Sequence, residues 1–95
     1  MDEAIFLLEV KFSNKAEKFL KKCEPKLLAR LKELFAHLAI EPVPFKQYDL
    51  TKLTGSSHMY RIRLSSHRAV YQINSERKTI SVLKIEKRSD STYDF

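Results

Sequence analysis

The chain has 95 residues, of which 43% are hydrophobic, and this is enough for one small domain over residues 1–95 with a single hydrophobic core. The formal net charge of +6 favours an anionic partner, either a nucleic acid or an acidic protein. The single cysteine, Cys23, excludes a disulfide framework, and no apolar run reaches the length of a membrane span. Asp2 and Glu3 stand where a signal peptide would carry positive charge. We therefore expect a cytoplasmic protein without a membrane association.

The first part of the chain predicts a strand followed by two helices. Residues 4–12 alternate apolar and polar side chains, which is typical of a strand with one buried face. Asn14 is a candidate helix N-cap, with Glu17 three residues later as in a capping box, and apolar residues then recur at helical spacing. Pro25 suits the first turn of a second helix over 25–40. The short break between the helices predicts a helical hairpin, which needs a sheet against which to bury its apolar sides.

The remainder predicts three consecutive strands. Residues 41–57 contain two prolines and lack a clean periodicity, so we expect a loop there. Strands are expected over 58–64, 67–74 and 79–86, separated by polar turns. The predicted fold class is α+β, with the element order β-α-α-β-β-β. Its antiparallel sheet carries the N-terminal helical hairpin on one face and leaves the other face open.

Three arginines are expected to meet on the open face of this sheet. Arg61 and Arg63 alternate with apolar residues, so their guanidinium groups lie on one face, about 7 Å apart. Arg68 begins the next strand after a tight turn and returns beside them. Three neighbouring cations repel one another unless an anion lies between them. The pattern therefore favours an anion site, with an ordinary solvated strand face as the alternative.

Other candidate chemistry is less well supported by the sequence. Cys23 continues an apolar helical series and is interpreted as a core residue. His58 and His67 flank the predicted hairpin, and a histidine pair can act as an acid–base couple, so this alternative stays open. The histidines, the cysteine and the scattered carboxylates show no metal-ligand spacing. We expect no metal and no cofactor.

Four segments together carry a recognisable pattern. They are Lys52-Leu53-Thr54-Gly55, Tyr60-Arg61-Ile62-Arg63-Leu64, His67-Arg68-Ala69-Val70-Tyr71, and Ile85-Glu86-Lys87-Arg88 followed by Tyr93. In this order and approximate spacing, over nearly the whole chain, they resemble the RelE/ParE superfamily of toxins from toxin–antitoxin pairs. No single segment is highly specific, but the combination is. The resemblance implies a fold similar to that of small microbial ribonucleases.

The resemblance also implies an activity. Toxins of the RelE branch cut messenger RNA in the ribosomal A site without a metal. Toxins of the ParE branch inhibit DNA gyrase and generally lack the full basic set and the C-terminal tyrosine. This chain keeps both features, which places it on the RelE side. The residues that match the catalytic positions of the RelE pattern are Arg61, Arg63, Arg68, Arg88 and Tyr93.

The expected protein is therefore a toxin that acts as a ribosome-dependent, metal-independent endoribonuclease and inhibits translation by cleaving messenger RNA in the A site. Its implied partners are an acidic cognate antitoxin, the ribosome with its ribosomal RNA, and the messenger RNA substrate. Two alternatives stay open, namely a non-enzymatic ParE-like gyrase inhibitor and an inactive RNA-binding relative. Arginine keeps its proton up to a pKa above about 12, so the sequence does not identify the general base.

Overall fold

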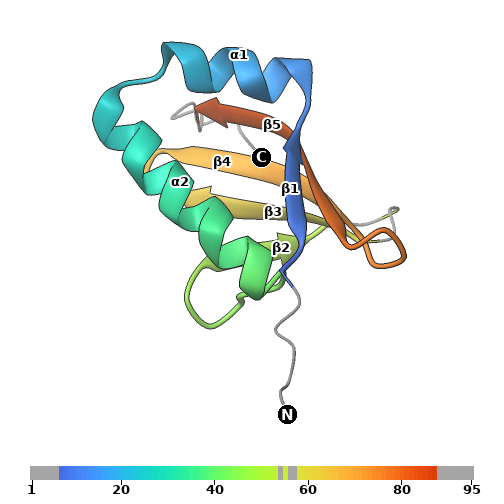
Figure 1. Cartoon of the computed structure of the whole chain (residues 1–95). Helices are drawn as coiled ribbons and strands as arrows, with labels where there is room; N and C mark the ends of the chain where they lie inside the picture. The colour runs from blue at the N-terminus through green and yellow to red at the C-terminus, as the bar shows by residue number, and fades with distance from the viewer. Residues whose placement is uncertain (1–6, 54, 56–57, 88–95) are drawn as a thin grey trace.

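The computed structural model describes residues 7–53, 55 and 58–87. These residues form five strands and two helices in one layered arrangement, with both helices on the same face of a single sheet (Figure 1). In chain order the elements are β1 (Glu9–Phe12), α1 (Asn14–Lys22), α2 (Pro25–Ile40), β2 (Asp49–Lys52), β3 (Met59–Leu64), β4 (His67–Asn74) and β5 (Thr79–Lys87). Neither of these helices is long and apolar enough to cross a membrane. The predicted α+β fold with a helical hairpin on one face is confirmed.

The sheet has the strand order β1-β5-β4-β3-β2. Strands β3, β4 and β5 form the expected antiparallel meander. Two details differ from the sequence prediction. Strand β1 pairs with β5 in parallel, a pairing that requires a long connection, and here the connection contains both helices and the strands β2 to β4. Strand β2 lies inside the stretch expected to be a loop and pairs antiparallel with β3, so the sheet is mixed and has five strands.

Helix α1 begins one residue earlier than the sequence pattern indicated. Its N-cap is Ser13, not Asn14, because the Ser13 hydroxyl oxygen accepts a hydrogen bond of 3.0 Å from the backbone N–H of Ala16. The same hydroxyl donates to the backbone oxygen of Leu83 on β5 at 2.6 Å. Ser13 therefore connects the start of α1 to strand β5.

Leu83 is the extra residue of a β-bulge. The pairing of β4 with β5 shifts between Val70 and Tyr71, whose partners are Lys84 and Val82. Without the bulge, Val82 and Ile85 would lie on opposite faces of the sheet, because side chains alternate along a regular strand. With it, both are buried in the same core, and Ser13 satisfies the carbonyl group of Leu83 at the irregular position.

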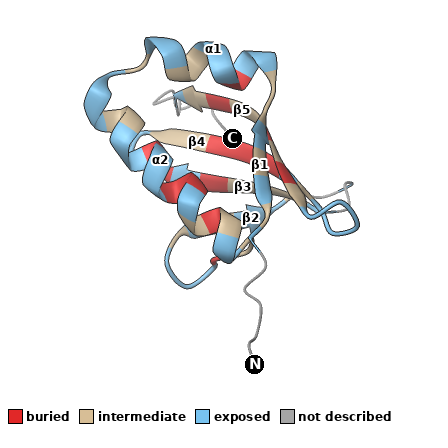
Figure 2. Cartoon of the chain, in the orientation of Figure 1, coloured by how far each residue is buried: buried red, intermediate tan, exposed pale blue. Residues whose placement is uncertain are grey.

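The core lies between the sheet and the two helices (Figure 2). Helix α2 contributes most of the buried helical side chains, and the central strands contribute the rest. The fully buried large hydrophobic residues are Leu31, Leu34, Leu38, Ile62, Tyr71, Ile80 and Val82. The Tyr71 hydroxyl donates to the backbone oxygen of Pro42 at 2.6 Å, and burial raises the pKa of this phenol above its ordinary value. Tyr71 thus anchors the chain that leaves α2 onto the centre of the sheet.

Candidate active site

The three arginines of the β3–β4 hairpin lie on the face of the sheet that the helices leave open. Ile62 and Leu64 are buried on the covered face, so alternation places Arg61 and Arg63 on the opposite one. Arg68 stands directly across from Arg63 in the pairing of β3 with β4, as the sequence predicted. All three arginines line one small hollow with a volume of about 110 Å³. We call it the arginine hollow; its lining residues are Asp49, Thr51, Arg61, Arg63 and Arg68.

Two carboxylates from neighbouring strands offset the repulsion among these cations. Asp49 on β2 pairs with Arg63, with Oδ2 and Nη1 separated by 3.0 Å. Glu86 on β5 pairs with Arg68, with Oε2 and Nε separated by 3.6 Å. The Arg63 and Asp49 side chains are 45% and 60% exposed, and an exposed ion pair of this kind contributes about 0–1 kcal/mol. An incoming phosphate can therefore displace Asp49 from Arg63 at small cost. The Arg68 side chain is only 20% exposed, so its pair with Glu86 is less open to solvent.

Sequence reasoning missed both carboxylates. Asp49 belongs to a four-residue edge strand with a single apolar residue between polar ones, which gives too weak a pattern to recognise. Glu86 could have been predicted from the sequence, because it follows the core residue Ile85 on a predicted strand. Its alternation places it on the open face, and the meander brings that face beside Arg68.

Two of the five predicted catalytic residues, Arg88 and Tyr93, lie outside the described residues, as does Thr54 of the first family segment. Strand β5 ends at Lys87, which pairs with His67 at the start of β4. Arg88 therefore follows directly after a residue whose position in the sheet is known. Its proposed role and that of Tyr93 rest on the sequence pattern.

The two histidines that flank the hairpin do not form an acid–base couple. His58 precedes β3, and His67 pairs with Leu64 at the other end of that strand. Six residues of extended chain separate the two ends, a distance of about 20 Å. The His67 ring lies on the covered face, edge-on to Phe19 of α1 with centroids 5.5 Å apart. Burial, and secondarily the charge of Lys87, lowers the pKa of His67.

A second basic surface lies at the helix side of the sheet. A groove of about 740 Å³ opens between α1, the start of α2 and the β3–β4 turn. We call it the lysine groove. Its cationic lining residues are Lys15, Lys18, Lys22, Lys26, Arg30 and Lys87. Its floor includes the apolar side chains of Phe19, Leu27 and Ile85, and the half-buried Cys23 lines it as well. The lysines of α1 and of the start of α2 thus border an apolar recess.

Known proteins share both the sequence pattern and the fold. The chain matches the family model of the ParE toxin of the type II toxin–antitoxin system parDE over residues 10–92. A toxin relative from Methanocaldococcus jannaschii, named RelE1, is 32% identical over 79 residues, which cover 83% of this chain and 88% of the relative. The chain therefore belongs to the RelE/ParE superfamily and is a toxin of a toxin–antitoxin system.

Solved structures support the same conclusion. The archaeal RelE–RelB complex from Pyrococcus horikoshii contains a chain that matches this fold with a TM-score of 0.80 and 31% identity, covering 90% of this chain and 99% of the other. The isolated E. coli RelE toxin matches with a TM-score of 0.77 and 25% identity, covering 90% of this chain and 89% of the other. The resemblance deduced from the four sequence segments is confirmed.

Proposed function

We propose that this toxin is a ribosome-dependent, metal-independent endoribonuclease that cleaves messenger RNA in the A site and so inhibits translation. The observation that carries the proposal is the position of Arg68 directly across from Arg63, with Arg61 in the same hollow. Three guanidinium groups around one open hollow suit a phosphate, since each can donate two parallel hydrogen bonds to phosphate oxygens. The RelE names of the relatives agree with this activity.

Cleavage without a metal uses the 2′-hydroxyl of the RNA as the nucleophile. Its oxygen bonds to the adjacent phosphorus, the bond to the 5′-oxygen breaks, and a cyclic phosphate and a free 5′-hydroxyl result. Protein groups have to accept the 2′-proton, stabilise the charge on the phosphorus oxygens and protonate the leaving oxygen. We assign the charge stabilisation to Arg63 and Arg68, which exchange Asp49 and Glu86 for the phosphate.

We assign the remaining tasks to other residues of the five-residue set and to Asp49. Arg61 would orient the 2′-hydroxyl, and Arg88 would act near the leaving oxygen. Tyr93 would stack on a base or donate its hydroxyl. Asp49 is the carboxylate within the arginine hollow, so we assign it the 2′-proton, which an arginine cannot accept at neutral pH. Asp49→Asn should then slow cleavage by about 10²-fold or more. An unchanged or faster rate would show that Asp49 only neutralises Arg63.

The basic surfaces of the toxin also suit two macromolecular partners, an antitoxin and the ribosome. Toxins of this superfamily are solved in complex with RelB antitoxins, and we propose a cognate antitoxin with acidic segments for this chain. The ribosome would be bound through ribosomal RNA phosphates at the lysines of α1 and at the arginine hollow. When the toxin is mixed with the product of the neighbouring gene, the two should form a tight complex that is no longer toxic. A toxin that no neighbouring product neutralises would contradict this pairing.

Single-turnover cleavage of messenger RNA on programmed ribosomes tests the catalytic assignment. Arg68→Ala should lower the rate by about 10²–10³-fold, because a charge contact in the transition state is lost. Because the Arg68 side chain is only 20% exposed, a thermal melt of the variant accompanies the assay and shows that a lower rate does not come from unfolding. Lys18→Ala on α1 is the matched control: it removes a cation outside the arginine hollow and should weaken ribosome binding while leaving the rate at saturation intact.

A folded Arg68→Ala variant that cleaves at the rate of the unmodified protein would overturn the assignment. The ParE description of the matched family model favours gyrase inhibition as the second candidate function. Inhibition of supercoiling by the purified toxin, without any cleavage of messenger RNA, would establish that function in place of the first.

A further inference from the structure

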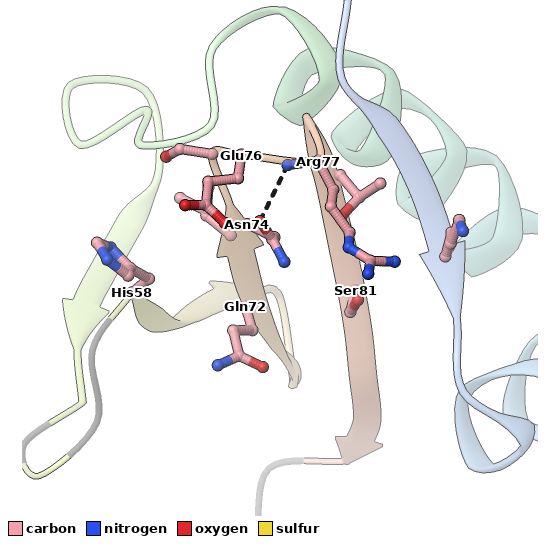
Figure 3. Close-up of a pocket in the computed structure, with 10 residues that line it drawn as sticks. His58, Gln72, Asn74, Glu76, Arg77 and Ser81 are labelled. Carbon is pink, nitrogen blue, oxygen red and sulfur yellow. Dashed lines mark hydrogen bonds between the residues drawn. The ribbon is translucent and has the colours of Figure 1, made fainter.

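A second hollow lies on the open face of the sheet, at the end of β4 that is far from Arg68 (Figure 3). We call it the polar hollow; its volume is about 740 Å³. Gln72 and Asn74 on β4 and Ser81 on β5 enter it from neighbouring strands. Arg77 comes from the turn between those strands, and His58 stands at the start of β3. The volume falls within the range of about 300–1,000 Å³ that is typical of small-ligand sites.

The polar hollow and the arginine hollow belong to one continuous face. Gln72 and Asn74 stand four and six residues after Arg68 on β4, so alternation points all three side chains the same way. Gln72 is therefore about 13 Å from Arg68 along the strand. Val70 lies between them and pairs with Arg61 across the hairpin. A nucleic acid strand with one phosphate in the arginine hollow can follow β4 and place a neighbouring nucleotide in the polar hollow.

The side chains of the polar hollow suit a nucleobase better than a second phosphate. Each amide offers both a donor and an acceptor, the combination that reads base edges. The oxygen of Asn74 already accepts a hydrogen bond of 3.0 Å from the backbone N–H of Arg77, so its NH₂ group remains to donate to a ligand. Lys11 and Arg77 supply cations for the flanking phosphate, while the acidic Glu76 can accept from an exocyclic amino group.

The position of His58 is fixed by the backbone. Its φ of 64° lies in the left-handed region, where histidine is more common than most residues, and its carbonyl oxygen accepts from the N–H of Ile73 at 2.9 Å. This bond extends the pairing of β3 with β4 by one residue and holds the imidazole at the rim of the polar hollow. A ring in this place can stack on an unpaired base, as aromatic side chains do in single-stranded RNA sites.

We propose that the polar hollow binds the base of a messenger nucleotide away from the scissile phosphate, and that Gln72 and Asn74 read its edge. The inference rests on the proposed nuclease function and adds a determinant of sequence preference to it. The cations of the arginine hollow hold every RNA alike, because phosphates carry no sequence information. Preference among messenger sequences then comes from the amides at the other end of the face.

Cleavage rates on ribosomes programmed with a set of A-site codons and flanking nucleotides test this. Gln72→Ala should reduce the rate ratio between the best and the poorer sequences by about 10-fold or more, since one amide–base pair gives discrimination of this order. Gln47→Ala, an exposed glutamine outside the polar hollow, is the matched control and should keep the ratio. Thermal melts verify that both variants fold.

Binding provides a second readout that does not depend on cleavage. Short single-stranded RNAs with 2′-O-methyl groups cannot be cut, and their affinities for the toxin can be compared by fluorescence anisotropy. The toxin should discriminate among sequences, and Gln72→Ala should lose that discrimination while Gln47→Ala keeps it. An unchanged preference in Gln72→Ala, or an equal loss on every sequence, would overturn the inference. A toxin that cleaves nothing would contradict the nuclease function, and the binding comparison would still decide the role of the polar hollow.

Discussion

The two faces of the sheet are built from the same strands but follow opposite rules. On the covered face, Ile62, Tyr71 and Ile80 have no exposed surface. On the open face, Arg63 and Gln72 stand on the same strands and are exposed. Within the described residues no charged side chain is buried. The covered face therefore carries the stability of the fold, and the open face is free to hold charges and amides.

The first prediction compares two adjacent residues of β3, one on each face of the sheet. Ile62→Ala should lower the free energy of unfolding by about 2–5 kcal/mol, because it leaves a cavity in the core. Arg63→Ala, one position along, should change it by no more than about 0.5 kcal/mol, since the Arg63 side chain is 45% exposed and its ion-pair partner Asp49 is exposed as well. Urea denaturation of both variants measures the difference. If Arg63→Ala were as destabilising as Ile62→Ala, the open face would be a structural surface and not a free one.

A second prediction concerns Ser13, which joins the helix layer to the sheet. Ser13→Ala should lower the free energy of unfolding by about 0.5–2 kcal/mol, because the N-cap of α1 is lost. The carbonyl of Leu83 in the β5 bulge also loses its donor. Asn14→Ala is the control and should have little effect, since Asn14 is the first residue of α1 and not its cap. The reverse ranking of the two variants in thermal melts would restore Asn14 as the N-cap.

The elements that sequence reasoning found are those with a long periodic pattern. Helix α2 and the strands of the meander repeat apolar residues over several turns or pairs, so their hydrophobic period identifies them. Strand β2 was missed because four residues with one apolar side chain show no period, and its pairing with β3 alone makes it a strand. The N-cap was misplaced by one residue because serine and asparagine are both good caps, and contact with the Leu83 carbonyl selects Ser13.

The candidate site shows the same dependence on local sequence patterns: residues within one hairpin could be predicted, and residues from separate strands could not. Arg61, Arg63 and Arg68 lie within one hairpin, so alternation and a tight turn bring them together from local sequence alone. Asp49 and Glu86 come from other strands, and only the strand order places them beside those arginines. The polar hollow likewise combines residues from β1, β4, β5 and the segment before β3. Sites assembled across strands need the topology before they can be recognised.

The smallest expected effect on stability is the pH dependence that His67 causes. Its ring lies on the covered side of the sheet, while its neighbours on the turn face solvent. Burial lowers its pKa from the ordinary value of 6.5, the charge of Lys87 lowers it further, and Glu24 acts in the opposite direction. The unfolded chain therefore binds the proton more readily than the folded one. The resulting stability is fully present above about pH 6.5 and is lost as the pH falls through the lower pKa of the folded state.

The melting temperature should accordingly decrease between about pH 7 and pH 5.5, and part of that decrease should vanish in His67→Phe, which keeps an aromatic contact with Phe19 but cannot titrate. Identical pH profiles for His67→Phe and the unmodified protein would show that His67 is solvated in solution.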